Sequence, residues 1–351
     1  MKKIIKQILN KYLQKGFAST DLCGGHSFDI KKFPAGYFRS FGRKNPDKVF
    51  YVIWRDHGGS GFFSNVSHVL CHLKIADQAG MIPVVDFQNF KTLYNENEAV
   101  NNTRNAWEYY FQQVAPVPLA EVYESQNVFF CSGVYPPSMS YCITKINGLH
   151  DEIYKKYIFL QKYIEGLIAQ HSVKFNGRIL GVHFRGQEQK RAPLHSFPPT
   201  EKQMVRCTDE IIEKYKIDKI FLVTEDQGYL DLFVNRYGKR VLHTGSYRTH
   251  SVNAYNLNPR EKHRYLLGME ILVDSFLLSR CHGILHGDSN VSEFARFINN
   301  GEYEFSYDIQ NGVNSANILT ARYLYEVKKM LPSCLGGLPG KILITSKVTK
   351  G

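Results

Sequence analysis

The chain has 351 residues, of which 43% are hydrophobic and 13% aromatic, and it carries a formal net charge of +12. This composition excludes a disordered chain, and the length suits two domains of ordinary size. Every apolar stretch is shorter than the roughly 18 residues that a membrane-spanning helix requires. The seven cysteines are scattered without a CxxC pair, which does not fit a disulfide framework or a zinc site, so we expect free, mostly buried thiols.

The excess positive charge is concentrated at the amino end. Residues 1–50 hold eleven Lys or Arg against three Asp, a net +8, and the remaining residues add +4. Within Lys2–Lys15, apolar side chains fall on one helical face and lysines around the rest. This pattern fits a helix lying on an anionic bilayer, or an amphipathic helix docked on the domain. No signal-peptide cleavage site follows, so we expect a cytoplasmic protein that is peripheral on the inner face of the membrane.

The predicted elements alternate between strands and helices, which is typical of an α/β fold with parallel sheets. In the first half we expect strands at 49–54, 82–86 and 127–130, and helices at 62–79, 106–113 and 150–171. In the second half we expect strands at 179–184, 219–224 and 283–286, and helices at 200–215, 229–237, 261–279 and 289–299. A turn signal at 175–178 predicts a first domain at 1–172 and a second at 173–300, with residues 301–351 packing back on the first domain.

A polar, glycine-rich turn follows the strand at 49–54. It comprises Arg55, Asp56, His57, Gly58, Gly59, Ser60 and Gly61, with Ser64 and Asn65 in the helix behind it. Such a turn lets the backbone approach a ligand at a helix N-terminus, which favours negative charge. It is not a dinucleotide fingerprint, because Ser64 stands where the third glycine belongs. A tight turn with a capped helix is the structural alternative, but three ionisable groups at a strand end favour a site.

The strand at 179–184 ends in the most informative residues of the chain, His183, Phe184, Arg185 and Gly186. In extended chain His183 and Arg185 point to the same face. Ligands of parallel sheets gather at the carboxyl ends of strands, and a guanidinium can bond two phosphate oxygens at fixed geometry. We therefore predict that Arg185 holds an anionic group. The alternatives are a salt bridge for Arg185 and a hydrogen-bonded structural role for His183.

Two later strands also end in polar residues. Glu225 and Asp226 could bind a metal, ribose hydroxyls or a cation, or Asp226 could cap the next helix. Ser289 and Asn290 open the helix after the strand at 283–286, where capping chemistry is expected and backbone N–H groups could also bind phosphate. The chain contains no Asp-x-Asp motif, with which many nucleotide-sugar transferases hold a divalent metal. We therefore predict no metal and no cofactor.

Taken in this order, these segments resemble the GDP-fucose-dependent fucosyltransferase superfamily, which includes α1,6-fucosyltransferases and protein O-fucosyltransferases. The resemblance spans roughly residues 178–298, with weaker support from the glycine-rich turn. It is carried by His183-Phe184-Arg185, Thr224-Glu225-Asp226, Asp274 and Ser289-Asn290-Val291. It implies a GT-B-like fold, in which two Rossmann-type domains face each other across a cleft. It also implies inverting, metal-independent transfer, with the acceptor on the side of residues 1–172 and the nucleotide sugar on the second domain.

The resemblance also implies roles for individual residues. Arg185 would bind the donor β-phosphate and stabilise the departing GDP, while His183 and Asp274 would contact the guanosine. Ser289 and Asn290 would bind the phosphates, and the acidic positions Glu225 and Asp226 would shape the donor site. One departure is Gly186, where the α1,6 branch commonly has a second arginine. The second cation would then be Arg191 or Arg55, or the donor sugar would differ.

Inversion requires a base near the acceptor hydroxyl while the charge on the leaving diphosphate is neutralised. Glu188 is the first candidate base, with Asp56 and His57 as alternatives. The sequence thus predicts a GDP-sugar glycosyltransferase that acts on a glycan or lipid-linked glycan. GDP-L-fucose is the leading candidate for the donor. The alternatives are a non-catalytic nucleotide-sugar or glycan-binding protein of the same fold, and a transferase of another GDP-sugar such as a GDP-heptose. Nucleic-acid binding ranks last, because the basic residues form no recognised motif.

Overall fold

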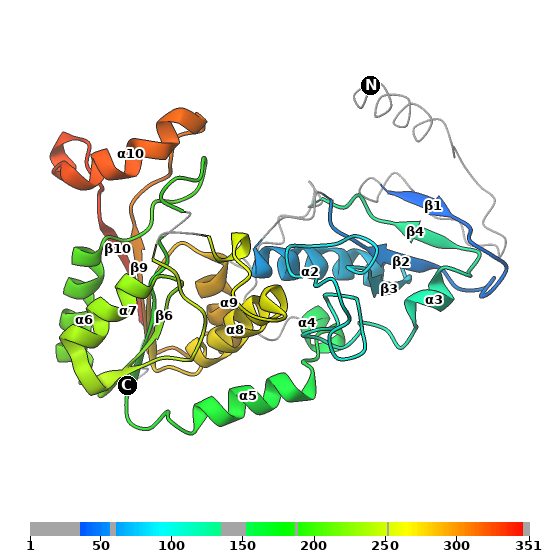
Figure 1. Cartoon of the computed structure of the whole chain (residues 1–351), viewed down its shortest axis with the longest axis horizontal. Helices are drawn as coiled ribbons and strands as arrows, with labels where there is room; N and C mark the ends of the chain where they lie inside the picture. The colour runs from blue at the N-terminus through cyan, green and yellow to red at the C-terminus, as the bar shows by residue number, and fades with distance from the viewer. Residues whose placement is uncertain (1–35, 57–60, 135–151, 187–188, 251–252, 347–351) are drawn as a thin grey trace.

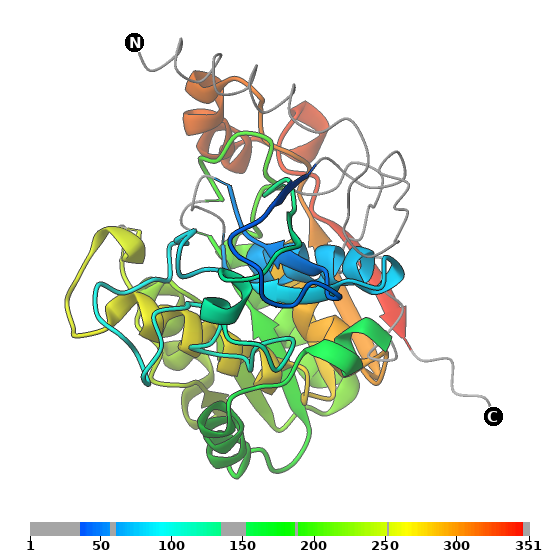
Figure 2. The same cartoon turned by 90° about the vertical axis from the view of Figure 1, so that its right-hand side faces the viewer.

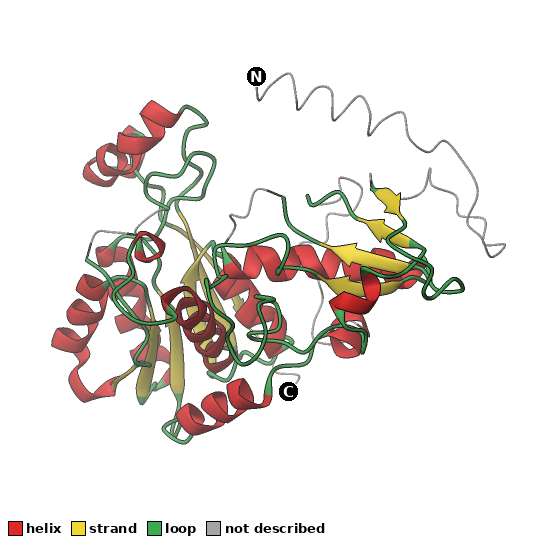
Figure 3. Ribbon diagram, turned by 45° about the vertical axis from the view of Figure 1, so that its right-hand side comes forward, coloured by secondary structure: helices red, strands yellow, loops and turns green. Residues whose placement is uncertain are grey.

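The computed structural model describes residues 36–56, 61–134, 152–186, 189–250 and 253–346 (Figure 1). The predicted helix Lys2–Lys15 lies outside these residues. The described part forms two sheets with helices packed on them, which confirms the α/β class with two parallel-rich sheets (Figure 3). In this part of the chain, none of the helices has the length and apolar character needed to cross a bilayer.

The first sheet has four strands in the order β1-β4-β2-β3. Strands β2 (Phe50–Ile53), β3 (Ile82–Val85) and β4 (Val128–Phe130) are parallel, and β1 (Tyr37–Arg39) is an antiparallel edge. Side chains alternate along β2, so that Tyr51 and Ile53 pack with helix α2 (Phe62–Gln78) while Phe50 and Val52 form a smaller core. Near that smaller core lies the short helix α3 (Leu119–Val122).

The second sheet has six strands in the order β10-β9-β8-β5-β6-β7. Five of them are parallel, namely β5 (Ile179–His183), β6 (Lys219–Val223), β7 (Val241–Leu242), β8 (Gly283–Gly287) and β9 (Phe305–Gln310). The chain runs outward from β5 to β7 on one side and then returns to place β8 and β9 on the other. This is the strand order of a Rossmann fold, with its switch point between β5 and β8.

Helices cover both faces of the second sheet. One face packs on α6 (Glu201–Tyr215) and α7 (Gln227–Tyr237), and the other on α8 (His263–Leu278) and α9 (Asn290–Asn299). Figure 1 shows α8 and α9 between the second sheet and α2. The rings of Phe63 in α2 and Phe294 in α9 stack at 4.2 Å, and the core of the first sheet continues through them into the second. The two sheets therefore share one buried core.

Most predicted strands and helices appear within one or two residues of their expected bounds, but two predicted helices are wrong. Residues 106–113 form turns, because Phe111 and Gln112 pair with the backbone at Leu160 and Phe159. The predicted helix at 150–171 is divided into α4 (Glu152–Tyr157) and α5 (Lys162–Ser172). The residues between α4 and α5 pair with the segment at 106–113, and the Gln161 N–H donates to the Tyr110 carbonyl at 2.9 Å.

Residues 301–351 were expected to pack back on the first domain. The two strands of this segment, β9 and β10 (Lys341–Ser346), instead belong to the second sheet, β10 as an antiparallel edge. Helix α10 (Ile318–Met330) connects them. Within the described residues, every strand of the first sheet lies before residue 131 and every strand of the second after residue 178. The predicted change of domain near residue 172 falls between these two groups of strands.

Candidate functional site

The carboxyl ends of β5 and β8 lie side by side at the switch point of the second sheet. His183 of β5 is in register with His286 of β8, so the residues that follow each strand leave the sheet at the same edge. These are Phe184, Arg185 and Gly186 after β5, and Asp288 and Ser289 after β8. Ligands of open α/β sheets bind at this place, because the two connections leave in opposite directions and open a crevice. The structure thus brings together two of the sequence-predicted segments.

Arg185 is half-buried at this edge and makes no hydrogen bond or ion pair with any residue that the structure describes. The salt bridge considered as the alternative from the sequence is therefore absent from the described residues. A half-buried guanidinium normally finds carboxylates or carbonyls for its five N–H donors. Its position at the switch point, with those donors unpaired among the described residues, suits it to an anionic ligand.

His183 is buried beside Arg185. Burial, together with the nearby positive charges of Arg185 and His286, lowers the pKa of His183 to about 3. Its ring is therefore neutral at pH 7. Its Nδ1 atom is buried and has no hydrogen-bond partner among the described residues, so the hydrogen-bonded structural role is not what the structure shows. The proposed contact with guanosine stays a prediction.

Gly186 is required by packing. Its N–H donates to Glu225 Oε1 at 3.0 Å, and a Cβ atom there would lie 2.6 Å from the hydroxyl oxygen of Tyr229 and 2.8 Å from its ring. That ring stacks flat on Phe184, with centroids 3.7 Å apart, so it is held in place. A second arginine, as in the α1,6 branch, would require Tyr229 to move. The contact with Tyr229 of α7 thus explains why position 186 is a glycine and not a second arginine.

We predict that Gly186→Ala lowers the free energy of unfolding by about 1–3 kcal/mol, as expected when a methyl group is forced into a packed site. Gly166→Ala is the matched control, because Gly166 is exposed in helix α5 and a Cβ there meets nothing within 4 Å. That change should raise stability by up to about 1 kcal/mol. Urea unfolding of both variants measures the two effects, and equal stability of Gly186→Ala and the wild type would contradict the packing requirement.

The acidic pair after β6 supports this same loop. Glu225 accepts the Gly186 N–H, as described above. Asp226 caps helix α7, since its Oδ1 accepts the N–H groups of Gly228 at 2.8 Å and Tyr229 at 3.4 Å. The capping role considered for Asp226 from the sequence is thus confirmed. Whether these carboxylates also shape the donor site stays a prediction.

Asp274 is buried in α8 and organises the loop after β7. Its carboxylate accepts hydrogen bonds from the hydroxyls of Thr244 at 2.6 Å and Ser246 at 3.0 Å. The backbone carbonyls of the same two residues accept from Arg248. Burial raises the pKa of Asp274 to about 6, and the two hydroxyls and Arg248 oppose that rise. Thr244, Ser246 and Arg248 were not predicted as site residues, because they come close to Asp274 only through the fold. Contact of Asp274 with guanosine stays a prediction.

The raised pKa of Asp274 predicts a pH dependence of stability. In the folded state Asp274 keeps its proton up to about pH 6, whereas the ordinary pKa of an Asp carboxyl is 3.8. Raising the pH from 3.8 towards and above 6 therefore lowers the stability of the folded state relative to the unfolded state. The difference in unfolding free energy between wild type and Asp274→Asn should therefore fall by about 2–3 kcal/mol as the pH rises from 4 to 7. Denaturant titrations across this range measure it, with Asp47→Asn at an exposed turn as the control. A difference that is independent of pH would contradict the prediction.

Helix α9 begins directly at the switch point. Ser289 is its N-cap, since its Oγ accepts the Val291 N–H at 3.3 Å, which confirms the capping chemistry expected there. Asn290 is the first helical residue and is exposed. Gly287 is confined, because a Cβ there would lie 2.6 Å from Pro199. The helix N-terminus thus presents its partial positive charge at the same edge as Arg185.

The glycine-rich turn lies only partly within the described residues. His57, Gly58 and Gly59 are outside them, as is Glu188, so the structure gives no position for these candidates. Asp56 follows β2, with its N–H bonded to the Gly133 carbonyl at 2.8 Å. Gly61 is the N-cap of α2, and the stacking of Phe63 on Phe294 holds the first turn of α2 against α9. The start of α2 is therefore close to the second sheet. The cleft between the two domains stays a prediction.

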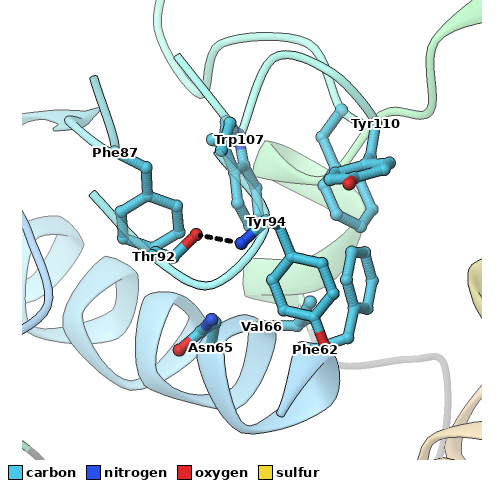
Figure 4. Close-up of a pocket in the computed structure, with 10 residues that line it drawn as sticks. Phe62, Asn65, Val66, Phe87, Thr92, Tyr94, Trp107 and Tyr110 are labelled. Carbon is cyan, nitrogen blue, oxygen red and sulfur yellow. Dashed lines mark hydrogen bonds between the residues drawn. The ribbon is translucent and has the colours of Figure 1, made fainter. Parts of the chain in front are cut away.

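Asn65 lines a pocket inside the first half of the chain (Figure 4). The pocket is walled mainly by the aromatic rings of Phe62, Phe87, Tyr94, Trp107, Tyr110 and Phe111. Asn65 is buried beneath them. A role for Asn65 in ligand binding stays a prediction.

A second cluster of chemistry-bearing side chains was not visible in the sequence. His68 and His72 of α2 and Cys131 after β4 offer ligand atoms within 4.8 Å of one another and could hold a metal ion. However, both ring nitrogens of His72 already have partners, the Tyr51 hydroxyl at 2.8 Å and the Val134 carbonyl at 3.0 Å. His68 bonds the Trp54 carbonyl at 2.8 Å. The described contacts therefore fit a buried hydrogen-bonded network. The sequence does not reveal it, because 58 residues separate His72 from Cys131.

No protein-family model and no curated protein sequence matches the chain. Several solved structures are similar to it. NodZ α1,6-fucosyltransferase co-crystallised with GDP has 16% sequence identity and a TM-score of 0.49, with 85% of this chain and 98% of that chain covered. POFUT1 in complex with GDP has 12% identity and a TM-score of 0.34, over 74% and 71% of the two chains. A mutant of Arabidopsis thaliana FUT1 in complex with GDP has 9% identity and a TM-score of 0.44, over 75% and 71%. All three are fucosyltransferases, the group that the sequence motifs resemble.

Proposed function

We propose that the chain is an inverting, metal-independent glycosyltransferase that transfers a sugar from a GDP-sugar to a glycan or lipid-linked glycan. GDP-L-fucose is the leading candidate for the donor. The observation that carries the proposal is Arg185. It lies at the switch point of a Rossmann-type sheet, and its guanidinium has no partner among the described residues. The N-terminus of α9 opens at the same edge. A guanidinium and a helix N-terminus together suit a diphosphate. The guanosine and the sugar come from the sequence resemblance alone.

The proposed reaction is a single displacement. An acceptor hydroxyl oxygen forms a bond to the anomeric carbon while the bond from that carbon to the diphosphate oxygen breaks, and a base takes the hydroxyl proton. The additional negative charge on the departing GDP falls where Arg185 and the α9 amides can stabilise it. Glu188 is the first candidate base, with Asp56 and His57 as the others. Unchanged turnover in Glu188→Gln would eliminate Glu188.

The test of this proposal is a transfer assay with wild-type protein and GDP-L-fucose, run with glycan and lipid-linked glycan acceptors. GDP release and the anomeric configuration of the product report on transfer and inversion. We expect inverted product at equal rates in EDTA and in added Mg²⁺ or Mn²⁺. Strict dependence on a divalent metal would overturn metal independence. Binding of GDP-sugar without any transfer would favour the non-catalytic alternative, and transfer from a GDP-heptose alone would change the sugar but not the donor class.

We also propose that the protein works in the cytoplasm and is peripheral on the inner face of the membrane. The net +8 of residues 1–50 and the amphipathic pattern of Lys2–Lys15 support this proposal. Vesicle binding that falls with added salt would agree with it, because surface electrostatics is screened by salt.

A further inference from the structure

Helix α10 carries an apolar stripe that faces away from the protein. Its members are exposed, from 47% for Val327 to 78% for Met330. We define the α10 patch as Ile318, Leu319, Tyr323, Val327, Met330 and Leu335, the last in the turn after the helix. At 100° per residue, four of them, Leu319, Tyr323, Val327 and Met330, fall within about 80° of the helix circumference. Contiguous apolar surface of this kind marks an interaction site on a soluble protein.

The opposite side of α10 is anchored to the second sheet and its loops. Ala321 and Tyr325 are buried, and the Tyr325 ring lies 6.0 Å from the ring of Phe197. The amide of Asn314 donates to the Ala321 carbonyl at 3.0 Å. In Figures 1 and 2, α10 stands at the upper edge of the molecule, outside the body of the second sheet. The helix is therefore held with its apolar stripe outward.

Basic side chains accompany the stripe. Arg322, Lys328 and Lys329 lie on α10 against a single carboxylate, Glu326, so the helix has a net charge of +2. On the helix circumference Glu326 lies about 20° from the edge of the stripe, and Arg322 and Lys329 follow at about 60° and 80° on the same side. An apolar stripe edged by Lys and Arg is the pattern of a helix that lies in the surface of an anionic bilayer.

We infer that the α10 patch is a membrane-contact surface that docks the protein on anionic lipid. Charge separates this occupant from the two others that the chain itself could supply. The amphipathic segment Lys2–Lys15 is strongly basic, so it would repel α10 rather than cover it. A second copy of the chain, joined through a two-fold axis, would bring together two α10 helices that each carry a net charge of +2. An anionic bilayer instead attracts both α10 and the amino end.

This inference extends the proposed membrane association to a second, described surface, and it is independent of sugar transfer. The energy would come from apolar burial in the lipid interface together with attraction between the basic side chains and anionic headgroups. Met330, Leu319 and Tyr323 are the most informative residues to change, because they are the most exposed members of the stripe.

The experiment measures binding of the full chain to vesicles of phosphatidylcholine, with and without 30% phosphatidylserine. The test variant combines Leu319→Ser, Tyr323→Ser and Met330→Ser, and the control combines Phe159→Ser, Val173→Ser and Val234→Ser, which are exposed apolar residues outside the patch. We expect wild type and control to bind the anionic vesicles and the test variant to bind about tenfold more weakly or worse. Unchanged thermal unfolding and GDP binding would show that the test variant is folded.

Three outcomes would overturn the inference. The test variant could bind anionic vesicles as tightly as wild type, which would leave the amino end as the membrane contact. Wild type could bind neutral and anionic vesicles equally, which would remove the role of charge. Wild type could also be a dimer in solution that the three substitutions dissociate, which would assign the patch to a second copy. None of these outcomes depends on whether the protein transfers a sugar, so they are distinct from failure of the proposed function.

Discussion

Arg185→Ala is expected to lower kcat/KM for sugar transfer by about 10²–10³-fold, the size of effect seen when one preorganised group that stabilises developing negative charge is removed. The same change should weaken GDP binding, because the diphosphate loses its bidentate partner. Arg185→Lys should recover only part of the activity, since an ammonium keeps the charge but not the planar fork. Steady-state kinetics and calorimetric titration with GDP measure both effects.

Stability separates this role from a structural one. Because Arg185 has no partner among the described residues, its removal breaks no described hydrogen bond or ion pair, and Arg185→Ala should leave the melting temperature equal or higher. Arg236→Ala is the matched control, because Arg236 forms an exposed ion pair with Asp209 across α6 and α7. Such pairs contribute little, so its activity should be unchanged. Activity of Arg185→Ala within about threefold of wild type would refute the assigned role.

Phe294→Ala should lower the free energy of unfolding by about 3–5 kcal/mol, as for other fully buried phenylalanines. Phe294 stacks on Phe63 and also packs against Phe276 and Phe297, so the cavity would open where the two sheets share their core. Because this contact holds α2 against α9, we also expect a loss of transfer activity in the molecules that remain folded. Urea unfolding and kinetics below the unfolding transition measure the two effects.

The control for Phe294 is Phe305→Ala. Phe305 is equally buried but lies at the amino end of β9, beside Gly283 and Tyr215 and away from the switch point. Its loss should cost similar stability while the folded fraction keeps its activity. A double-mutant cycle with Phe63→Ala would give the coupling between the two stacked rings. If Phe294→Ala and Phe305→Ala had the same kinetics per folded molecule, the stacked pair would have no part in positioning the two halves.

The second sheet could be predicted from the sequence because its central strands are continuous apolar runs and its helices have recognisable caps. Thr200 and Ser289 each accept a backbone N–H of the helix that they begin, as their residue types indicate. The edge strand β10 carries no such signal, because its side chains are largely exposed and its place depends on pairing with β9. The same holds for residues 106–113, whose helical pattern is overridden by pairing with residues 159–161.

The candidate site was predictable as residue types but not as an arrangement. The sequence places Arg185, Glu225 and Ser289 at strand ends, but only the strand order shows that β5 and β8 meet at the switch point. The need for glycine at position 186 depends on the ring of Tyr229, 43 residues away. The exposed stripe of α10 was equally hidden, because an apolar helical face in a sequence ordinarily indicates burial.

The most direct test of the central claim is a thermal-shift measurement of wild type and Arg185→Ala with GDP, UDP, ADP and CMP. We expect GDP to raise the melting temperature of wild type, because a ligand at 100 times its Kd stabilises the folded state by about 2.7 kcal/mol. The other nucleotides should have smaller effects, and Arg185→Ala should lose the response to GDP. Stabilisation of wild type by UDP but not by GDP, or an undiminished GDP shift in Arg185→Ala, would contradict a GDP-sugar site at Arg185.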